Sequence, residues 1–246
     1  MRIDERRQLI LKELHESGGL DVPALAFRHS VSESTIRRDL KLLDSQGMLQ
    51  RVRGGAIDVD KHSFAQTEPT GADEKAQIGH YCSSLVPDNS VVLLDIGTTT
   101  AAIARSLYNR PLTVLTASLA VVDILRHSST TELIILGGVL RRSYLSMVGS
   151  LTERALTGLR ADIAFIGTSG VCEDHTVMDS TGTEVPIKRA ILSHSRVSYL
   201  VAGSEKFPGS GVLPVCQVNE FSGMITTCSN SITQSIQNSG TQVMYA

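Results

Sequence analysis

The stretch SESTIRRDLKLL, residues 32–43, decides the fold of the N-terminal part of the chain. Ile36, Leu40 and Leu43 are spaced by four and three positions, so they share one face of a helix that can pack on other helices. Ser32 stands before this helix and is a favourable N-cap. The opposite face carries hydroxyl and cationic side chains: Ser34, Thr35, Arg37, Arg38 and Lys41. Such a helix suits the major groove of DNA, where small polar groups approach base edges and Arg can bond guanine bidentately.

Two helices are expected before this stretch. The first spans residues 4–17 and stops at the glycine pair 18–19. The second is short; it follows Asp21, an acceptable N-cap, and carries Pro23 in its first turn. Together with the helix at residues 32–43, they predict a compact helix-turn-helix unit.

A short basic hairpin is expected after the helices. Residues 49–57, LQRVRGGAI, alternate apolar and polar side chains around Gly54-Gly55, a pattern typical of two strands joined by a tight turn. Arg51 and Arg53 are expected to lie against phosphates or the minor groove beside the recognition helix. The sequence therefore predicts the wing of a winged helix-turn-helix.

A basic segment within a slightly acidic chain supports DNA binding. Residues 34–57 hold five basic and two acidic residues, a local charge of +3, whereas the whole chain has a formal net charge of −2. An ordinary solvated helix face is the commoner fate of such a cluster, and a helix-turn-helix can also contact protein alone. The helices, the cap and the basic hairpin in this order favour double-stranded operator DNA as the partner. The predicted DNA-binding residues are Ser32, Ser34, Thr35, Arg37, Arg38, Lys41, Arg51, Arg53 and Gly54.

The rest of the chain predicts an α/β fold. Short β-branched apolar runs recur, each followed by Gly, Ser or Thr and then a helical stretch, an alternation typical of a largely parallel open sheet. The expected strands lie at residues 91–96, 112–116, 133–136, 163–166, 199–202 and 224–227. Residues 58–73 are polar and without periodicity, so they are expected to form a linker. The predicted domains are a winged helix-turn-helix at 1–57 and an effector-sensing α/β domain at 74–246.

Strand ends in this second domain carry groups that can hold a phosphate. The loop DIGTTT, residues 95–100, follows a strong predicted strand and opens a helix. A glycine, three hydroxyls and free amides at a helix start can bind an anion. Gly-Thr-Thr also makes routine turns with Thr caps, so the loop alone leaves the two interpretations even. It matches neither a Walker A loop nor a dinucleotide fingerprint, and no cofactor is expected. Similar groups at other strand ends could line one crevice.

The chain resembles the DeoR family of bacterial transcriptional regulators over nearly its whole length. The resemblance rests on residues 32–40, Gly47, Arg51 and 53–56 in the first domain, and on 74–75, 78–79, the 95–100 loop, 136–138, 140–141, 148–149, 165–167, Glu184, 188–189 and 206–207 in the second. It implies a sensor domain similar to ribose-5-phosphate isomerase, a phosphorylated sugar or related intermediate as effector, and repression as the usual outcome. By this resemblance residues 97–100 bind phosphate, while Glu184, Lys188 and Lys206 face the sugar.

The predicted effector-binding residues combine the resemblance with the strand ends. They are Asp95, Gly97, Thr98, Thr99, Thr100, Thr116, Ser118, Gly137, Gly138, Gly167, Glu184, Lys188 and Lys206. Three positions depart from the family pattern: Ala117 stands in place of Asn, and Gly203 and Cys228 each stand in place of Asp. The departures remove groups that could bond sugar hydroxyls and leave Lys206 without the usual acidic neighbour. They predict an atypical effector or weakened binding.

An isomerase-like enzyme with an accessory DNA-binding domain is the alternative. Glu184 could act as the carboxylate base and Lys206 as the electrophile in sugar-phosphate isomerisation. Glu184 can equally be an exposed first-turn helix residue that the helix dipole favours. With Gly203 and Cys228 replacing acids, the sequence favours a regulator that is not an enzyme.

Composition narrows the remaining classes. The four cysteines lack C-x-x-C spacing and the seven histidines lack ligand spacing, so neither disulfides nor a metal site is expected. The apolar runs are too short to span a bilayer and the N-terminus leads into no apolar signal segment, so a cytoplasmic protein without membrane contact is expected. A homodimer or homotetramer, assembled mainly through the second domain, would present paired recognition helices to operator half-sites.

Overall fold

The computed structural model describes all residues except 1–2, 18, 46–47, 53 and 58–63. The chain divides into two compact units, Met1–Thr67 and Glu68–Ala246, each described by itself below. The division falls inside the predicted linker, part of which is helical: α4 spans Phe64–Thr67 and α5 begins at Ala72. Within the described residues, no helix combines the length and apolar character needed to cross a bilayer.

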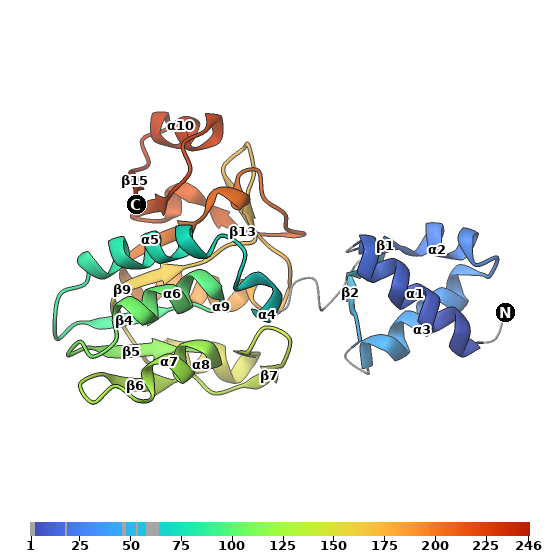
Figure 1. The fold of residues 1–246 in the computed structure, drawn as a ribbon, viewed down its shortest axis with the longest axis horizontal. Coiled ribbons are helices and arrows are strands. Elements are labelled where there is room, and N and C mark those ends of the chain that lie inside the picture. Colours follow the sequence, from blue (N-terminus) through green and yellow to red (C-terminus); the bar gives the residue numbers. More distant parts are fainter. Residues whose placement is uncertain (1–2, 18, 46–47, 53, 58–63) are drawn as a thin grey trace. The chain divides into compact units, whose positions relative to one another are not determined.

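The first unit is a three-helix fold with a small sheet (Figure 1). Its elements before α4 are α1 (Ile3–Ser17), β1 (Gly19–Asp21), α2 (Val22–Arg28), α3 (Glu33–Ser45), β2 (Gln50–Val52) and β3 (Gly55–Ile57). The apolar residues of α3, Ile36, Leu40 and Leu43, are buried in one core with side chains of α1 and α2. α2 begins as predicted, because the carboxylate of Asp21 accepts a hydrogen bond from the Ala24 amide at 2.8 Å.

The wing is a three-stranded antiparallel sheet in the order β1-β3-β2. The hairpin of β2 and β3 is the predicted one, whereas β1 was not predicted from the sequence. Gly55 is in register with Asp21 of β1, and a Cβ atom on Gly55 would come within 2.0 Å of the Leu20 carbonyl oxygen. The close approach of β1 therefore requires glycine at this position.

The second unit is built on a seven-stranded sheet in the order β15-β14-β12-β9-β4-β5-β6, in which every pairing is parallel (Figure 1). The strands are β4 (Val91–Leu94), β5 (Thr113–Thr116), β6 (Glu132–Ile135), β9 (Ala161–Ile166), β12 (Ser195–Ala202), β14 (Gly223–Thr226) and β15 (Val243–Tyr245). The first six coincide with the predicted strands, so the prediction of an α/β open sheet is confirmed.

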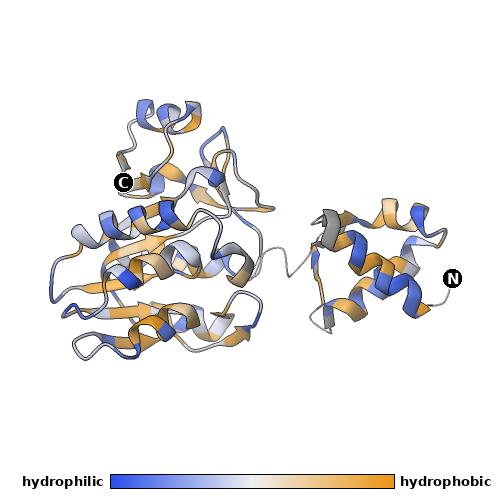
Figure 2. Ribbon diagram, in the orientation of Figure 1, coloured by the Kyte–Doolittle hydropathy of each residue, from blue (hydrophilic) through white to orange (hydrophobic). Residues whose placement is uncertain are grey.

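Helices cover both faces of the sheet. The bounds are α5 (Ala72–Ser84), α6 (Thr98–Ser106), α7 (Leu119–Leu125), α8 (Ser150–Thr157), α9 (Val185–Ser193) and α10 (Ser231–Asn238). Val92 and Leu94 of β4 share an apolar cluster with α5, α6 and α7, while Leu93 between them shares a second cluster with α8, α9 and α10. This alternation explains why the strands are almost continuously hydrophobic in Figure 2.

The order of the strands reverses between β4 and β9. From β4 the chain continues through β5 to β6 on one side, then returns to β9 beside β4 and continues outward through β12, β14 and β15. In open parallel sheets, ligands bind at the carboxyl ends of the strands that flank such a reversal. The loops after β4 and β9 therefore lie where a ligand is expected.

Two smaller antiparallel pieces flank the sheet, and neither was predicted. One is a hairpin of β7 (Val139–Arg141) and β8 (Ser146–Val148). The other is a sheet of β10 (Gly170–Val171), β11 (Thr176–Asp179) and β13 (Leu213–Gln217). Both contribute residues to the polar cluster described next.

Candidate nucleic-acid interface and ligand site

The polar face of α3 is available to a partner. Ser32, Ser34, Arg37, Arg38 and Lys41 are exposed and Thr35 is half-buried. The Ser32 hydroxyl accepts a hydrogen bond from the Thr35 amide at 3.3 Å, so it caps the helix as predicted. Arg37 pairs with Glu33 at 2.8 Å, an exposed contact one helical turn apart that contributes about 0.5 kcal/mol or less. So weak a pair leaves the Arg37 guanidinium able to turn to a phosphate or a base.

A buried ion-pair network holds the back of α3, and the sequence interpretation missed it. Asp39 is 2% exposed; its Oδ2 lies 2.7 Å from the Arg6 guanidinium and its Oδ1 lies 2.9 Å from Nε of Arg7. Asp39 is three positions after Ile36 and four before Leu43, so helical spacing already placed it on the buried face. The network fixes α3 to α1 and so sets the direction of its polar face.

The wing presents one described basic side chain. Arg51 is exposed, and its amide donates a hydrogen bond to the Asp44 carboxylate at 3.2 Å, which ties β2 to α3. Gly54 is exposed and has φ +90°, a conformation that favours glycine at a hairpin turn. The predicted contact residue Arg53 lies outside the described residues.

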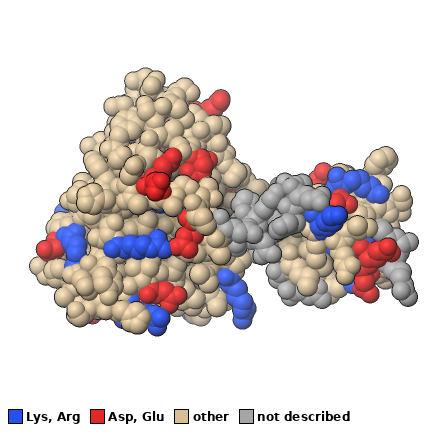
Figure 3. Space-filling model, in the orientation of Figure 1, with Lys and Arg blue, Asp and Glu red and all other residues tan. Residues whose placement is uncertain are grey.

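The second unit buries its main charge cluster. On the face shown in Figure 3, basic and acidic side chains are interspersed over this unit. Asp95, Asp179, Glu184 and Lys188, in contrast, are each at most 5% exposed. Charged groups are buried only where they are paired or serve a ligand, so this cluster marks the candidate site.

The loop after β4 begins α6 without a side-chain cap. Gly97, the N-cap residue, has φ +119° and ψ 176° and makes no side-chain cap hydrogen bond. The Thr100 hydroxyl donates back to the Gly97 carbonyl at 3.0 Å. Thr98 and Thr100 are buried and Thr99 is half-buried. The amides of residues 98–100 thus lie at the positive end of a helix dipole, an arrangement that suits an anion.

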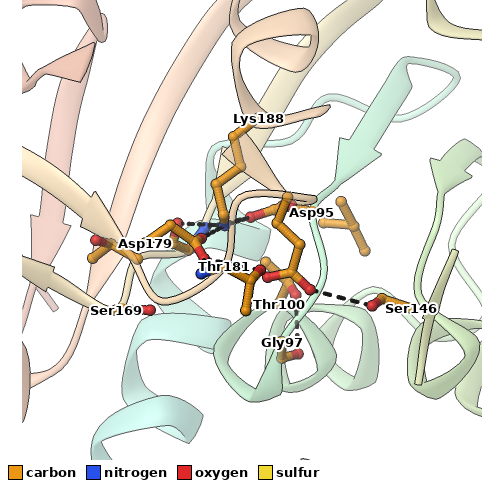
Figure 4. A network of polar contacts seen from close by, with 12 residues as sticks. Asp95, Gly97, Thr100, Ser146, Ser169, Asp179, Thr181 and Lys188 are labelled. Carbon is orange, nitrogen blue, oxygen red and sulfur yellow. Dashed lines mark hydrogen bonds and ion pairs between the residues drawn. The ribbon is translucent and has the colours of Figure 1, made fainter. Parts of the chain in front are cut away.

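Asp95 and Lys188 join the ends of β4 and β9. Oδ2 of Asp95 accepts hydrogen bonds from the Gly167 amide at 3.1 Å and from Nζ of Lys188, and Lys188 donates also to the Gly167 carbonyl at 2.9 Å (Figure 4). Lys188 lies 3.5 Å from Asp179 on its other side. Burial by itself lowers the pKa of Lys188, but the carboxylates around it outweigh burial and raise that pKa, so the lysine stays charged.

Glu184 is the N-cap residue of α9 and is engaged inside the cluster. It is 5% exposed, so the interpretation of an exposed first-turn residue is wrong. Its Oε1 pairs with Arg141 of β7 and accepts from the Ser146 hydroxyl of β8 at 3.3 Å. Burial raises the pKa of Glu184, and Arg141 opposes that shift. The β7–β8 hairpin is thereby attached to α9.

Tyr144, in the turn of this hairpin, lies against the α6 loop. Its Cε1 is 3.8 Å from the point where a Cβ atom on Gly97 would stand, and the Arg141 guanidinium lies 5.1 Å from the ring centroid. Burial raises the pKa of Tyr144 to about 12, so the phenol stays protonated at neutral pH. Neither Arg141 nor Tyr144 was assigned to the site from the sequence.

Four other predicted site residues have local structural contacts. The Thr116 hydroxyl donates to the Leu94 carbonyl at 2.9 Å, and the Ser118 hydroxyl caps α7 by accepting from the Val121 amide at 3.3 Å. The Gly137 carbonyl accepts from the Thr152 hydroxyl at 2.9 Å, and a Cβ on Gly138 would come within 2.1 Å of that same oxygen. These contacts give the four residues structural roles, and their binding of an effector stays a prediction.

Lys206 lies in a second polar cluster, at the ends of β12 and β14. Its Nζ is 3.6 Å from Glu205, an acidic neighbour other than the one that Gly203 removes. A Cβ on Gly203 would come within 2.6 Å of Glu205 and 2.9 Å of Glu74, which means that these two carboxylates fill the space beside Gly203. From the sequence, an acid beside Lys206 was expected only at position 203, and the longer side chains of Glu74 and Glu205 were not considered.

Lys75 of α5 belongs to the same cluster and was not assigned to a site. It is 4% exposed and donates to the Glu68 carbonyl at 3.4 Å. Burial lowers the pKa of Lys75; the nearby carboxylate of Glu205 opposes that shift and the charge of Lys206 adds to it. Two ammonium groups therefore lie near each other there. Within the described residues, no group of three His, Cys, Asp or Glu side chains could hold a metal ion.

Comparisons with known proteins identify the family of both units. Residues 6–62 match the DeoR-like helix-turn-helix domain and residues 70–227 match the DeoR C-terminal sensor domain. The chain is 35% identical over 230 residues to the uncharacterized HTH-type transcriptional regulator YgbI of Escherichia coli (strain K12), covering 90% of this chain and 89% of the relative. It is 28% identical over 230 residues to the glycerol-3-phosphate regulon repressor of Haemophilus influenzae, covering 92% and 90%. A ribose 5-phosphate isomerase A from Methanocaldococcus jannaschii is similar at 17% identity and a TM-score of 0.41, over 55% of this chain and 54% of that one.

Proposed function

The chain belongs to the DeoR family of helix-turn-helix transcriptional regulators, and on that basis we propose that it represses a carbohydrate-metabolism operon until a phosphorylated sugar or related metabolite binds its sensor unit. The glycerol-3-phosphate regulon repressor, similar over 92% of this chain, bears a name that joins repression to a phosphorylated metabolite. That relative supports both the direction of regulation and the class of effector.

One observation carries the DNA-binding part of the proposal: α3 buries Ile36, Leu40 and Leu43 and exposes most of its polar and cationic side chains on the other side. Ser34, Thr35, Arg37 and Arg38 would meet base edges in the major groove and supply sequence discrimination. Lys41 and Arg51 would meet phosphates, which position the protein and make its affinity depend on salt. Asp39 takes no part in contact and serves instead to fix the angle of α3.

The effector part of the proposal rests on the uncapped start of α6. The amides of residues 98–100 would hold a phosphate at the end of the sheet where the strand order reverses. Lys206, paired with Glu205, lies at the neighbouring strand ends. A bound effector can alter DNA affinity only through a difference in its affinity for the two states of the regulator.

An isomerase activity is the second candidate, and the contacts of Glu184 argue against it. A catalytic base must reach a carbon-bound proton of the substrate. Oε1 of Glu184 is instead engaged by Arg141 and by the Ser146 hydroxyl. We therefore propose a regulator without turnover; conversion of ribose 5-phosphate by the purified protein at an enzyme-like rate would overturn this.

A binding titration against the promoter region of the protein's own gene tests the DNA-binding proposal. Fluorescence anisotropy at several salt concentrations, with random-sequence duplex as competitor, separates specific from non-specific affinity. Arg38→Ala should lose about tenfold or more in specific affinity, because one good base contact is worth about 1–3 kcal/mol. Lys12→Ala is the matched control, since Lys12 is an exposed cation on α1. If Arg38→Ala keeps its preference for the promoter, the recognition-helix assignment fails.

A further inference from the structure

Glu33 places a negative charge on the polar face of α3. Its side chain is 49% exposed, and its Oε2 lies 2.8 Å from Nη2 of Arg37, one helical turn further along. The other two acids of α3 bond to groups outside the helix: Asp39 is buried against α1, and Asp44 accepts from the Arg51 amide of the wing. Glu33 is therefore the acid of α3 whose partner is a side chain assigned above to base reading.

A favourable helix end does not explain this pair. An acid anywhere in the first turn of a helix interacts favourably with the helix dipole, as Glu5 does in α1. That interaction does not require Glu33 to share a face with Arg37. A carboxylate on a surface that meets DNA is also repelled by the phosphates, which lowers the affinity for every sequence. A residue with this cost needs a compensating contact, and a base edge can supply it.

The two paired side chains still have groups to offer to a base pair. A guanidinium has several N–H donors, and the contact with Glu33 uses one of them. A carboxylate has about four acceptor sites, of which Arg37 takes one. Because the pair is exposed and weak, both side chains can reorient at little cost in stability. Together they can present two donors with an acceptor beside them.

This order of groups matches a G·C base pair in the major groove. Guanine presents two acceptors, N7 and O6, and cytosine presents the N4 donor beside them. An A·T pair presents an acceptor, a donor and another acceptor, so it cannot satisfy the same three groups. The residues of a recognition helix that reach base edges stand near its N-terminus. Glu33 and Arg37 stand there, because α3 begins at Glu33.

We propose that Glu33 and Arg37 read one G·C base pair together, with Arg37 bonding guanine and the Glu33 carboxylate accepting from N4 of the paired cytosine. The inference rests on the proposed DNA binding by α3 and adds a specificity-determining residue to it. At another base pair at least one of the two contacts is lost, while the repulsion between Glu33 and the phosphates remains. Glu33 thus lowers the affinity for the wrong sequences more than for the right one.

Selection from a library of random-sequence duplexes, followed by sequencing, shows which base pairs the full-length protein requires. The wild-type protein should require a G·C pair at the position where Arg37→Ala loses its preference. Glu33→Ala should reduce the preference at that same position about tenfold, because a hydrogen bond to a charged group accounts for such a ratio. If Glu33→Ala changes no position, or a different one from Arg37→Ala, this inference fails and DNA binding stands. If the wild-type protein enriches no sequence, the proposed DNA binding fails and this inference with it.

A modified duplex separates a direct contact of Glu33 from an indirect effect through Arg37. A methyl group on N4 of the cytosine replaces the hydrogen that faces the major groove and keeps the hydrogen bonds to guanine. In anisotropy titrations, this methyl group should weaken binding of the wild-type protein about tenfold and should hardly change the affinity of Glu33→Ala. An equal loss in both proteins would show that Glu33 does not bond N4, and would overturn the assignment.

Glu5→Ala is the matched control for charge. Like Glu33, Glu5 is an exposed acid in the first turn of a helix of the same unit. Its removal should change neither the preference for G·C nor the sensitivity to the methyl group, and a change as large as that in Glu33→Ala would trace the effect to net charge and overturn the contact. If Glu33→Ala does not fold, the wild-type protein still decides, because equal affinity for the methylated and unmethylated duplexes would sink the proposal.

Discussion

At the scale of single residues, the buried carboxylate of Asp39 has the largest predicted effect on stability. Asp39→Ala leaves Arg6, which is 7% exposed, as a buried cation without its partner. Removing one member of such a pair destabilises a domain by about 3–5 kcal/mol. Hydrogen exchange of the α1 and α3 amides should therefore quicken strongly. Glu33→Gln is the control, because it breaks only the exposed pair with Arg37 and should cost about 0.5 kcal/mol or less.

The unfolding of the two units of Asp39→Ala can be followed separately. The chain has no tryptophan and its five tyrosines, at positions 81, 108, 144, 199 and 245, all lie in the second unit. Tyrosine fluorescence therefore follows the sensor unit alone, while circular dichroism follows both. Asp39→Ala should shift the helical signal and leave the tyrosine transition unchanged. A tyrosine transition that moves by the same amount would show that the two units unfold together.

Gly97 is the second residue with a sharp prediction. Its φ of +119° and ψ of 176° lie in a region almost confined to glycine, and a Cβ there would meet Tyr144 only at an ordinary contact of 3.8 Å. The cost of Gly97→Ala is thus conformational, about 1–3 kcal/mol. Urea denaturation monitored by tyrosine fluorescence should show this loss of stability. Gly158→Ala, at φ −91° with no atom within 4 Å of the new methyl group, should change stability by about 0.5 kcal/mol or less; equal losses in both variants would contradict this account.

Individual residues also show where sequence reasoning stops. The exposure of Arg38 and Lys41 and the burial of Ile36 followed from helical spacing, because a helix turns by a fixed angle per residue. The partners of Asp95, Lys188 and Glu184 did not follow, since they stand far apart in the chain and meet only through the order of the strands. Spacing places a side chain on a face, whereas a buried ion pair depends on which faces come together.

At the scale of elements, Glu74 links α5 to the ends of β12 and β14. Its carboxylate accepts hydrogen bonds from the Ser204 amide at 2.7 Å, the Ser204 hydroxyl at 2.6 Å and the Thr227 hydroxyl at 2.9 Å. The Ser204 hydroxyl contributes most to lowering the pKa of Glu74 below its ordinary value of 4.5. A group whose pKa is lower in the folded state stabilises the fold above the unfolded pKa, and this stabilisation is lost as pH falls through the folded value.

Glu74→Gln should therefore show a stability difference that depends on pH. Thermal melts monitored by tyrosine fluorescence should show that the variant is less stable than the wild-type protein. Above pH of about 5 this difference in stability should be constant. The gap should narrow as pH falls past 4.5, where the Glu74 carboxylate of the unfolded chain takes up a proton before that of the folded chain. Glu132→Gln, an exposed carboxylate on β6, is the control and should follow the wild-type pH profile. A gap that stays constant down to pH of about 3 would exclude the ionised carboxylate as its source.

The elements that could be predicted were those with a strong repeating pattern. Six of the seven parallel strands followed from short β-branched runs, and α1, α2 and α3 followed from caps and apolar spacing. β1, β7, β8, β10 and β15 are two or three residues long, too short for any period to appear in their sequence. Two of them form the hairpin that covers the candidate site, so Arg141 and Tyr144 remained unassigned.

At the scale of the whole molecule, each chain would supply one recognition helix, the proposed α3, and this limits the number of base pairs that a single copy would read. A helix in the major groove contacts only a few base pairs, so regulators of this kind pair their helices through a twofold axis and read two half-sites on one face of the duplex. The predicted homodimer or homotetramer would provide such a pair. The half-sites would then lie about 10–10.5 base pairs apart, or a multiple of that spacing.

Changing the spacing of the operator tests this pairing directly. Inserting about 5 base pairs between the half-sites turns one of them to the opposite face of the duplex, so affinity should fall to that of a single half-site. Inserting about 10 base pairs restores the face and should recover part of the affinity, less the cost of stretching the protein. Anisotropy titrations on the three duplexes give the comparison, with Arg38→Ala as the reference for lost base contacts. If the insertion of about 5 base pairs leaves affinity unchanged, one recognition helix suffices and the paired arrangement is wrong.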